Sequence, residues 1–250
     1  MSQSFRKISS QLAKQIKLVM TDVDGTIAAG GEAAGPGVAE AVRRLMEQEI
    51  TVGLVSGRTL PELEQMARDL AISGPIIAEN GAVAKLNVND GLLDLGYSRK
   101  PALSALKKLQ RLYPGRVRVR SDNRDRIIDV VIFTDGIKPA ELRRHIGEVQ
   151  LLDSGYIQHL MQAGISKGDT LVKLLKLLPH KKLFAENIMV FGDSRTDISL
   201  FERFPHSVLV PNPLLTNDHR QELKNTAEYV SDRDSEVGFI EVTSHILNIR

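Results

Sequence analysis

Short apolar runs alternate with amphipathic stretches along the first third of the chain. The runs at 16–20, 50–55 and 75–78 predict strands that are buried on both faces. Between them, apolar residues recur with helical spacing at 38–49 and 60–70. Strands that alternate with helices in this way usually form a parallel sheet with right-handed crossovers, so this part of the pattern favours an α/β fold.

The same alternation returns near the C-terminus. The pattern predicts a helix at 169–178, a strand at 187–191, a helix at 195–203 and two short strands at 208–210 and 229–230. We therefore expect a doubly wound, Rossmann-like parallel sheet built from both ends of the chain.

The middle of the chain has a different pattern. An Asn-Asp-Gly turn between the runs 83–86 and 91–95 is a strong hairpin signal. The same order of hairpin and helix continues with a helix at 101–112, a strand pair at 116–120 and 127–134, a helix at 139–149, and a third hairpin near Leu151 and Tyr156. Hairpins grouped with helices predict an inserted α+β unit.

These patterns divide the chain into a tail, a core and an insert. The first fifteen residues are polar and mildly basic, which predicts a loose tail or a short first helix. The expected parts are an N-terminal tail at 1–15, a core domain at 16–82 and 161–250, and an inserted domain at 83–160.

Composition narrows the class of protein. The 250 residues include no cysteine, which excludes a disulfide framework, thiol chemistry and cysteine-ligated zinc. The formal net charge is only +2, tryptophan is absent and aromatic residues make up 4%, which argues against a nucleic-acid partner. The N-terminus lacks the apolar stretch of a signal peptide or a membrane span. We expect a cytoplasmic protein that has no membrane partner.

The first candidate for chemistry follows the first predicted strand. Asp22 and Asp24 are two residues apart in the segment Asp-Val-Asp-Gly-Thr, so in extended chain their side chains point to one side. Ligands bind at the carboxyl edge of open parallel sheets, and Gly25 allows a sharp turn there. Paired carboxylates bind a hard divalent cation such as Mg²⁺, whereas a polar strand-to-loop turn is the plain alternative.

A second acidic segment ends another predicted strand. Asp193 follows a buried run in Gly-Asp-Ser-Arg-Thr-Asp, and Asp197 comes four residues later. Both carboxylates are candidates for a metal site, with Asp197 either a ligand or a support for metal-bound water. N-capping of a helix by Asp193 or Ser194 is the alternative.

Two weaker signals have the residue types that bind phosphate. Ser56 and Gly57 lie at a predicted strand-to-helix turn, where a hydroxyl and backbone N–H groups can contact phosphate oxygens. Lys167 precedes a predicted helix and can neutralise phosphate charge. Taken alone, Ser56 and Gly57 are also compatible with an ordinary loop, and Lys167 with a solvated lysine at the start of a helix.

In this order, the four segments resemble the motifs of the haloacid dehalogenase-like hydrolase superfamily. The chain is similar to its Cof-type phosphatases, which carry a type-two cap between the second and third motifs, where the insert lies here. Asn80, Asn212 and Arg195 resemble residues on the substrate side of the site. One departure is Thr196, which stands where the fourth motif commonly has asparagine.

The resemblance implies a role for each segment. Asp22 would be the nucleophile, Asp24 the general acid and base, and Ser56, Gly57 and Lys167 the phosphate ligands. The implied cofactor is Mg²⁺, held by Asp22, Asp193 and the backbone carbonyl of Asp24, with Asp197 in support.

The implied function is hydrolysis of a small phosphate ester, phosphoglycolate or a sugar phosphate, by a monomer or homodimer. A phosphomutase of the same superfamily and a non-catalytic protein that binds phosphorylated metabolites are the alternatives.

One basic pattern in the insert has two interpretations. Arg116, Arg118 and Arg120 alternate with valines, which places three arginines on one face of a strand. That face either attracts anions above the site or is simply solvated.

Overall fold

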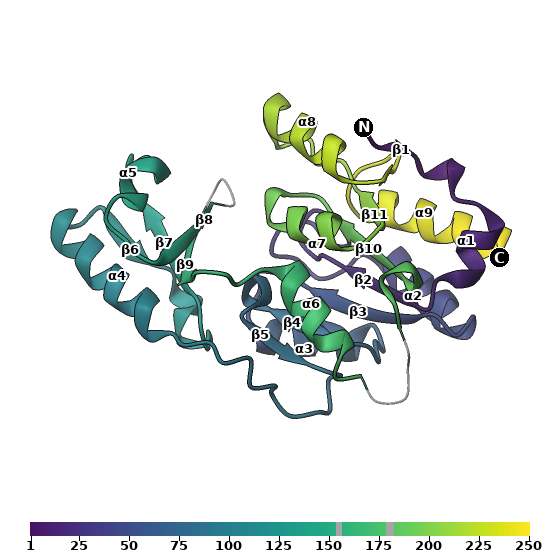
Figure 1. Ribbon diagram of the computed structural model, residues 1–250, viewed down its shortest axis with the longest axis horizontal. Coiled ribbons are helices and arrows are strands. Elements are labelled where there is room, and N and C mark those ends of the chain that lie inside the picture. The colour runs from purple at the N-terminus through teal and green to yellow at the C-terminus, as the bar shows by residue number, and fades with distance from the viewer. Residues whose placement is uncertain (154–156, 179–182) are drawn as a thin grey trace.

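The computed structural model describes residues 1–153, 157–178 and 183–250, and these form two β-sheets with their flanking helices. The larger sheet has eight strands and the smaller has four (Figure 1). In Figure 1 the small sheet and its helices lie to one side of the large sheet, and two chain segments connect the two parts.

The large sheet is parallel except at one edge. Its strands, in spatial order, are β1 (Gln3–Ser4), β12 (Tyr229–Val230), β11 (His206–Leu209), β10 (Ile188–Gly192), β2 (Leu18–Thr21), β3 (Thr51–Val55), β4 (Ile76–Ala78) and β5 (Val83–Lys85). Only β5 pairs antiparallel, with β4. The expected doubly wound α/β core is therefore confirmed, with β2 and β10 adjacent at its centre.

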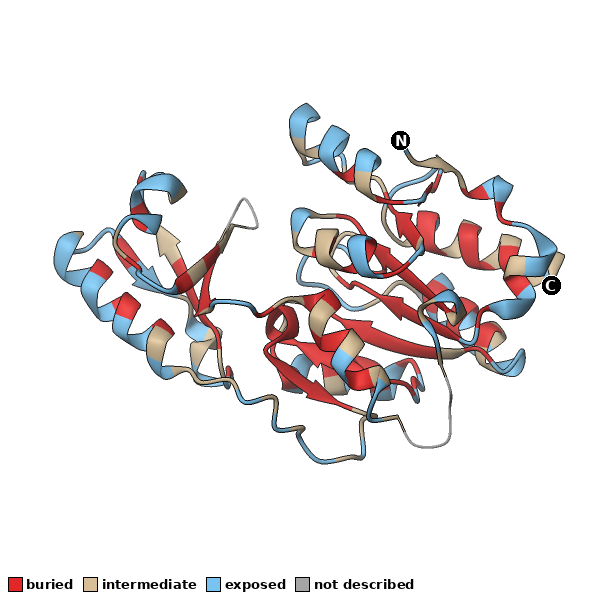
Figure 2. Cartoon of the chain, in the orientation of Figure 1, coloured by how far each residue is buried: buried red, intermediate tan, exposed pale blue. Residues whose placement is uncertain are grey.

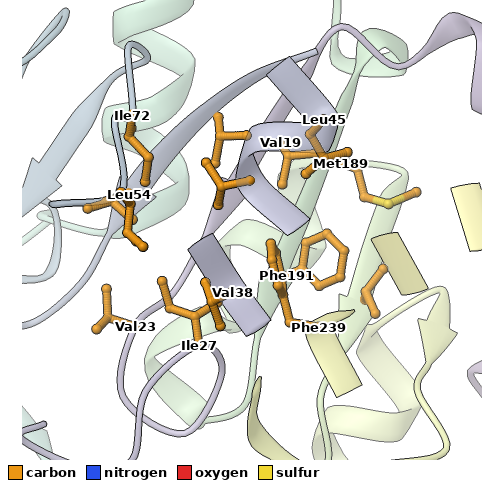
Figure 3. Close-up of a cluster of buried hydrophobic side chains, with 14 of the residues drawn as sticks. Val19, Val23, Ile27, Val38, Leu45, Leu54, Ile72, Met189, Phe191 and Phe239 are labelled. Carbon is orange, nitrogen blue, oxygen red and sulfur yellow. The ribbon is translucent and has the colours of Figure 1, made fainter. Parts of the chain in front are cut away.

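Helices cover both faces of this sheet. Successive residues of β2 alternate between them: Val19 packs into one buried cluster, while Leu18 and Met20 pack into the other. Figure 3 shows the first cluster, in which Phe191 and Phe239 meet edge to face. The core helices are α1 (Ser10–Gln15), α2 (Pro36–Glu47), α3 (Leu60–Asp69), α6 (Lys167–Leu175), α7 (Ile198–Arg203), α8 (Asn217–Thr226) and α9 (Ser235–Ile249).

The small sheet is antiparallel, as the hairpin signals predict. Its order is β6 (Val117–Val119), β7 (Val130–Thr134), β9 (Gln158–Gln162) and β8 (Val149–Asp153). Helix α4 (Lys100–Leu112) packs on one face, and α5 (Pro139–Arg143) joins the same apolar cluster. In Figure 1, α4 lies on the side of this sheet away from the core, so the face without α4 is turned toward the core. We call this unit the cap.

Two sequence predictions are wrong in detail. Residues 91–95 form no strand, and β5 pairs with β4 instead, which places β5 in the core sheet. The helix expected at 139–149 ends at Arg143, and Val149 already begins β8. Of the two interpretations of residues 1–15, the short first helix is present as α1, and β1 before it extends the sheet. The third hairpin is present as β8 and β9, although Tyr156 lies outside the described residues.

Burial is concentrated in the core strands, which Figure 2 shows almost entirely as buried. None of the helices described here is both long enough and apolar enough to cross a membrane. The exact division of the chain into domains at residues 83 and 160 stays a prediction.

Candidate active site

The central strands end at one edge of the large sheet, and a cavity of about 610 Å³ opens there. Asp22 follows β2, Ser56 follows β3 and Asp193 follows β10, so chain crossovers bring these three distant segments together. Residues of the cap, including Arg120 and His159, line the same cavity. The site therefore lies between the core and the cap.

A buried lysine links two of the carboxylates. The Lys167 ammonium donates to Asp22 Oδ1 and to Asp197 Oδ1, both at 2.7 Å. Lys167 is the first residue of α6, and Ser166 caps that helix by accepting the backbone N–H of Asp169. The cap residue fixes where α6 begins, which aims the lysine at the end of β2.

Asp197 supports the loop that follows β10. Its Oδ2 accepts the backbone N–H groups of Asp193 at 3.1 Å and Ser194 at 3.0 Å. Thr196 lines the cavity, and its hydroxyl meets that of Ser194 at 2.9 Å. The threonine that departs from the expected asparagine therefore stabilises the turn through its hydroxyl.

The acidic residues are close enough to share a cation. One carboxylate oxygen from each of Asp22, Asp193 and Asp197 lies within 4.8 Å of the other two. Burial raises the pKa of Asp22 to about 7, against the attraction of Lys167, and the charge of Asp197 adds to the rise. Burial also raises the pKa of Asp193 well above its ordinary value, reinforced by Asp22 and Asp197.

The donor set fits a hard divalent cation. Among the described residues, no hydrogen-bond partner reaches the buried Asp193 Oδ1, although Asn212 Nδ2 donates to Oδ2 at 2.5 Å. A buried, unpartnered carboxylate oxygen beside other carboxylates is costly unless a cation binds it. Oxygen ligands of this kind suit Mg²⁺.

Gly25 keeps the acidic cluster compact. Its φ is +83°, and a Cβ atom there would lie 2.2 Å from Asp193 Oδ2. A side chain at this position would be strained and would collide with a candidate metal ligand.

Asp24 is held by Arg58, a residue to which the sequence analysis assigned no role. Arg58 Nη2 donates to Asp24 Oδ1 at 2.6 Å and Nε donates to Oδ2 at 3.0 Å, while the Gly31 N–H donates to Oδ1 at 2.8 Å. Burial alone would raise the pKa of Asp24, but the Arg58 and Gly31 hydrogen bonds outweigh it and lower the pKa. In this arrangement Asp24 is a carboxylate.

The loop after β3 meets the cap. Asn80 donates its backbone N–H to the Ser56 carbonyl at 3.0 Å and adopts a left-handed φ of 55°. The Gly57 carbonyl accepts a hydrogen bond of 3.0 Å from the cap residue Arg126. The predicted phosphate loop is therefore fixed from both the core and the cap.

Glu79 makes a second connection to the cap. Its carboxylate accepts three consecutive backbone N–H groups, from Ile127 at 2.7 Å, Ile128 at 2.8 Å and Asp129 at 2.9 Å. Burial raises the pKa of Glu79, and the nearby Asp129 adds to that rise.

Most predicted site residues gather at the cavity. Those that line it are Asp22, Asp24, Ser56, Gly57, Asn80, Lys167, Asp193 and Asn212. Asp197 is fully buried and contacts Lys167. Arg195 lies apart, because its guanidinium pairs with Glu222 of α8 at 3.0 Å.

The alternating arginines in and beside β6 differ in their surroundings. Arg120 lines the cavity, as an anion-attracting surface requires. Arg118 is exposed and pairs with Asp135, and Arg116 donates to the carbonyl of the same residue, as on a solvated face. The solvated interpretation therefore holds for Arg116 and Arg118, and anion attraction by Arg120 stays a prediction.

Sequence reasoning missed four polar residues: Arg58, Glu79, Arg126 and His159. Only Arg58 carried a usable signal, because it directly follows Ser-Gly in the second motif. Arg126 and His159 lie in the cap, where no motif distinguishes them from solvated residues.

Comparisons with known proteins identify the family and agree with the fold. The family of haloacid dehalogenase-like hydrolases matches residues 19–113 and 117–242. A phosphoglycolate phosphatase of Methanoculleus marisnigri is 30% identical over 232 residues, which are 90% of this chain and 94% of that protein. Phosphoglycolate phosphatase 1 of Saccharolobus solfataricus is 29% identical over 237 residues, which are 93% of this chain and 96% of that protein.

Solved structures share the fold. A crystal structure of a Thermoplasma acidophilum protein superposes with a TM-score of 0.79 at 23% identity and covers 94% of this chain and 99% of that one. A haloacid dehalogenase superfamily phosphatase from Bacteroides thetaiotaomicron has a TM-score of 0.74 at 15% identity and covers 94% of this chain and 96% of that one.

The chain therefore belongs to the haloacid dehalogenase-like hydrolases, and the resemblance expected from its four motifs is confirmed. The family and the curated relatives together support phosphatase activity.

Proposed function

We propose that this hydrolase is a Mg²⁺-dependent phosphatase that cleaves a small phosphorylated metabolite through an aspartyl-phosphate on Asp22. The observation that carries the proposal is the buried cluster in which Lys167 contacts Asp22 while Asp193 lies within 4.8 Å. This cluster provides a nucleophile, a fixed positive charge and a cation site at one point of the cavity.

Asp22 is the nucleophile in this proposal. One of its oxygens is held by Lys167, which keeps the carboxylate oriented and reduces its repulsion of an anionic phosphate. Asp22, Asp193 and the backbone carbonyl of Asp24, with Asp197 in support, would hold Mg²⁺, which would supply further positive charge beside the phosphate. Ser56, Gly57 and Lys167 bind the phosphate oxygens.

Asp24 carries out the proton transfers. It protonates the leaving oxygen when the phosphoryl group passes to Asp22, and it then accepts the proton of the water that hydrolyses the aspartyl-phosphate. Because Arg58 holds Asp24 as a carboxylate, this pair must separate before Asp24 can act as an acid.

Phosphoglycolate is the first candidate substrate, because curated relatives that cover most of this chain are named for it. A sugar phosphate is the second candidate. Asn80 and Asn212 line the cavity and are available to bind either leaving group. A cytoplasmic location and a monomeric or homodimeric state remain expectations.

The decisive experiment replaces the proposed nucleophile. We expect the wild-type protein to release inorganic phosphate from p-nitrophenyl phosphate and 2-phosphoglycolate with Mg²⁺ and to stop when the cation is chelated. Asp22→Asn should abolish release and the trapped phosphoenzyme, whereas Asp69→Asn, which changes an exposed aspartate of α3, should leave both intact. Continued turnover by Asp22→Asn would refute the assignment. Turnover that requires a sugar bisphosphate would indicate a mutase.

A further inference from the structure

Polar side chains of the cap line the cavity opposite the acidic cluster. Two of them lie in one row across the small sheet: the Arg120 N–H donates to the Val131 carbonyl at 3.0 Å, and Val131 is the register partner of His159. Residues opposite each other on antiparallel strands point to the same face. Arg120 and His159 therefore share a face, and both line the cavity.

His159 is fixed from behind by a buried carboxylate. Its Nδ1 lies 2.7 Å from Asp129 Oδ2, and Asp129 is fully buried. Burial alone would raise the pKa of Asp129, but hydrogen bonds from His159 and Arg126 outweigh it and lower the pKa. Because Asp129 is an ionised acceptor, Nδ1 carries a proton, and Nε2 is the ring nitrogen left for a ligand.

The same network extends to the phosphate loop. Arg126 Nη1 donates to Asp129 Oδ1 at 2.8 Å and to the Gly57 carbonyl of the core at 3.0 Å. Three successive contacts thus connect His159 to the loop that begins with Ser56. The side chain of Arg126 is only 1% exposed, so this connection is shielded from water.

Arg120 is a partly exposed cation that lines the cavity beside His159. Arg126 also binds Asp122 at 2.7 Å, and Arg120 lies 3.4 Å from the same carboxylate. The side chain of Arg120 stays 40% exposed, so its guanidinium keeps donors free for a ligand beside His159.

We propose that His159, with Arg120 beside it, recognises a carboxylate on the leaving group of the substrate. The Nδ1 of His159 donates to Asp129, which leaves Nε2 to contact the carboxylate of the substrate beside the Arg120 guanidinium. Arg126 and Asp129 are positioning residues that set the distance between this carboxylate and the bound phosphate. The inference rests on the proposed phosphatase function and adds the residues of the cap that select a leaving group with a carboxylate.

A pair of esters of equal length tests this assignment. The substrates are 2-phosphoglycolate, which ends in a carboxylate, and 2-hydroxyethyl phosphate, which has a hydroxymethyl group in its place. We expect the wild-type enzyme to prefer 2-phosphoglycolate. Because a hydrogen bond to a charged group contributes about 10- to 100-fold in affinity, His159→Ala should lower that preference by this factor, mainly through KM.

Further variants separate recognition from general structural damage. Arg120→Met should lower the same preference, whereas Arg118→Met, which removes the exposed arginine two residues earlier, should not. Asp129→Asn keeps the shape of the side chain but should reduce the preference by releasing His159. Thermal unfolding of each variant checks that it is folded.

Three outcomes would overturn the inference. The first is a wild-type enzyme with no preference between the esters. The second is an equal loss on both esters in His159→Ala, and the third is a larger loss on the hydroxyl ester, which would make Nε2 an acceptor for a hydroxyl. A wild-type protein that hydrolyses p-nitrophenyl phosphate but shows one of these results retains the proposed phosphatase function. Failure on all three substrates with Mg²⁺ would refute both proposals.

Discussion

Replacing Asp22 by asparagine should stabilise the metal-free protein while it removes activity. The side chain is buried beside Asp193 and Asp197, and burial raises its pKa from 3.8 to about 7. An acid whose pKa is higher in the folded than in the unfolded state binds more protons when folded, so between these two pKa values stability falls as pH rises. Asp22→Asn cannot ionise and escapes this loss.

The size of this change in stability follows from the rise in the pKa of Asp22. One pKa unit corresponds to about 1.4 kcal/mol, and at pH 5 part of the penalty is already present because the unfolded chain is ionised there. Between pH 5 and pH 8, the stability of Asp22→Asn relative to wild type should therefore increase by about 2–3 kcal/mol.

Urea unfolding in the presence of a chelator, at pH 5 and pH 8, measures this difference. Asp69→Asn is the control, because that aspartate is exposed at the end of α3. Adding Mg²⁺ should reduce the advantage of Asp22→Asn, since the cation stabilises the protein whose ligands are complete. A difference that does not change with pH, or a less stable Asp22→Asn at pH 8, would refute the electrostatic reasoning.

Three further predictions follow from the same cluster. Lys167→Met should abolish activity and destabilise the protein by about 3–5 kcal/mol in chemical unfolding, because it leaves buried carboxylates unpaired, whereas the exposed Lys173→Met should have little effect. Arg58→Met should raise the pKa of Asp24 and move the alkaline limb of the kcat/KM pH profile to higher pH; an unchanged limb would contradict the pairing. In calorimetry, Mg²⁺ should raise the melting temperature of wild type but not of Asp193→Asn. An equal rise in both proteins would show that Asp193 is not a metal ligand.

The core of the fold was predictable because its signals are local. Strands such as β2 and β10 are continuous apolar runs, and their parallel pairing follows from the helices between them. The hairpin expected at 83–95 failed because the run 83–86 had a neighbouring strand on each side in the sequence. It pairs with β4, which precedes it, and this pairing extends a buried sheet, whereas residues 91–95 would have formed an isolated two-stranded hairpin.

The acidic part of the site was also predictable, because Asp22 and Asp193 each end a central strand of one sheet. The residues that hold the site together through long-range contacts were not predictable. The contact of Arg58 with Asp24 spans 34 residues, and that of Arg126 with Gly57 spans 69 residues and joins the cap to the core. No periodicity encodes contacts that depend on how two separately packed units meet.

The Glu79 carboxylate has a mechanical consequence for the cap. It holds three consecutive peptide N–H groups of residues 127–129, and Arg126 holds Gly57 close by. Lifting the cap straight away from the core would break all four hydrogen bonds and expose a buried carboxylate, whereas a swing about this corner breaks none of them. The corner at Glu79 should therefore serve as a pivot when the cap moves over the cavity.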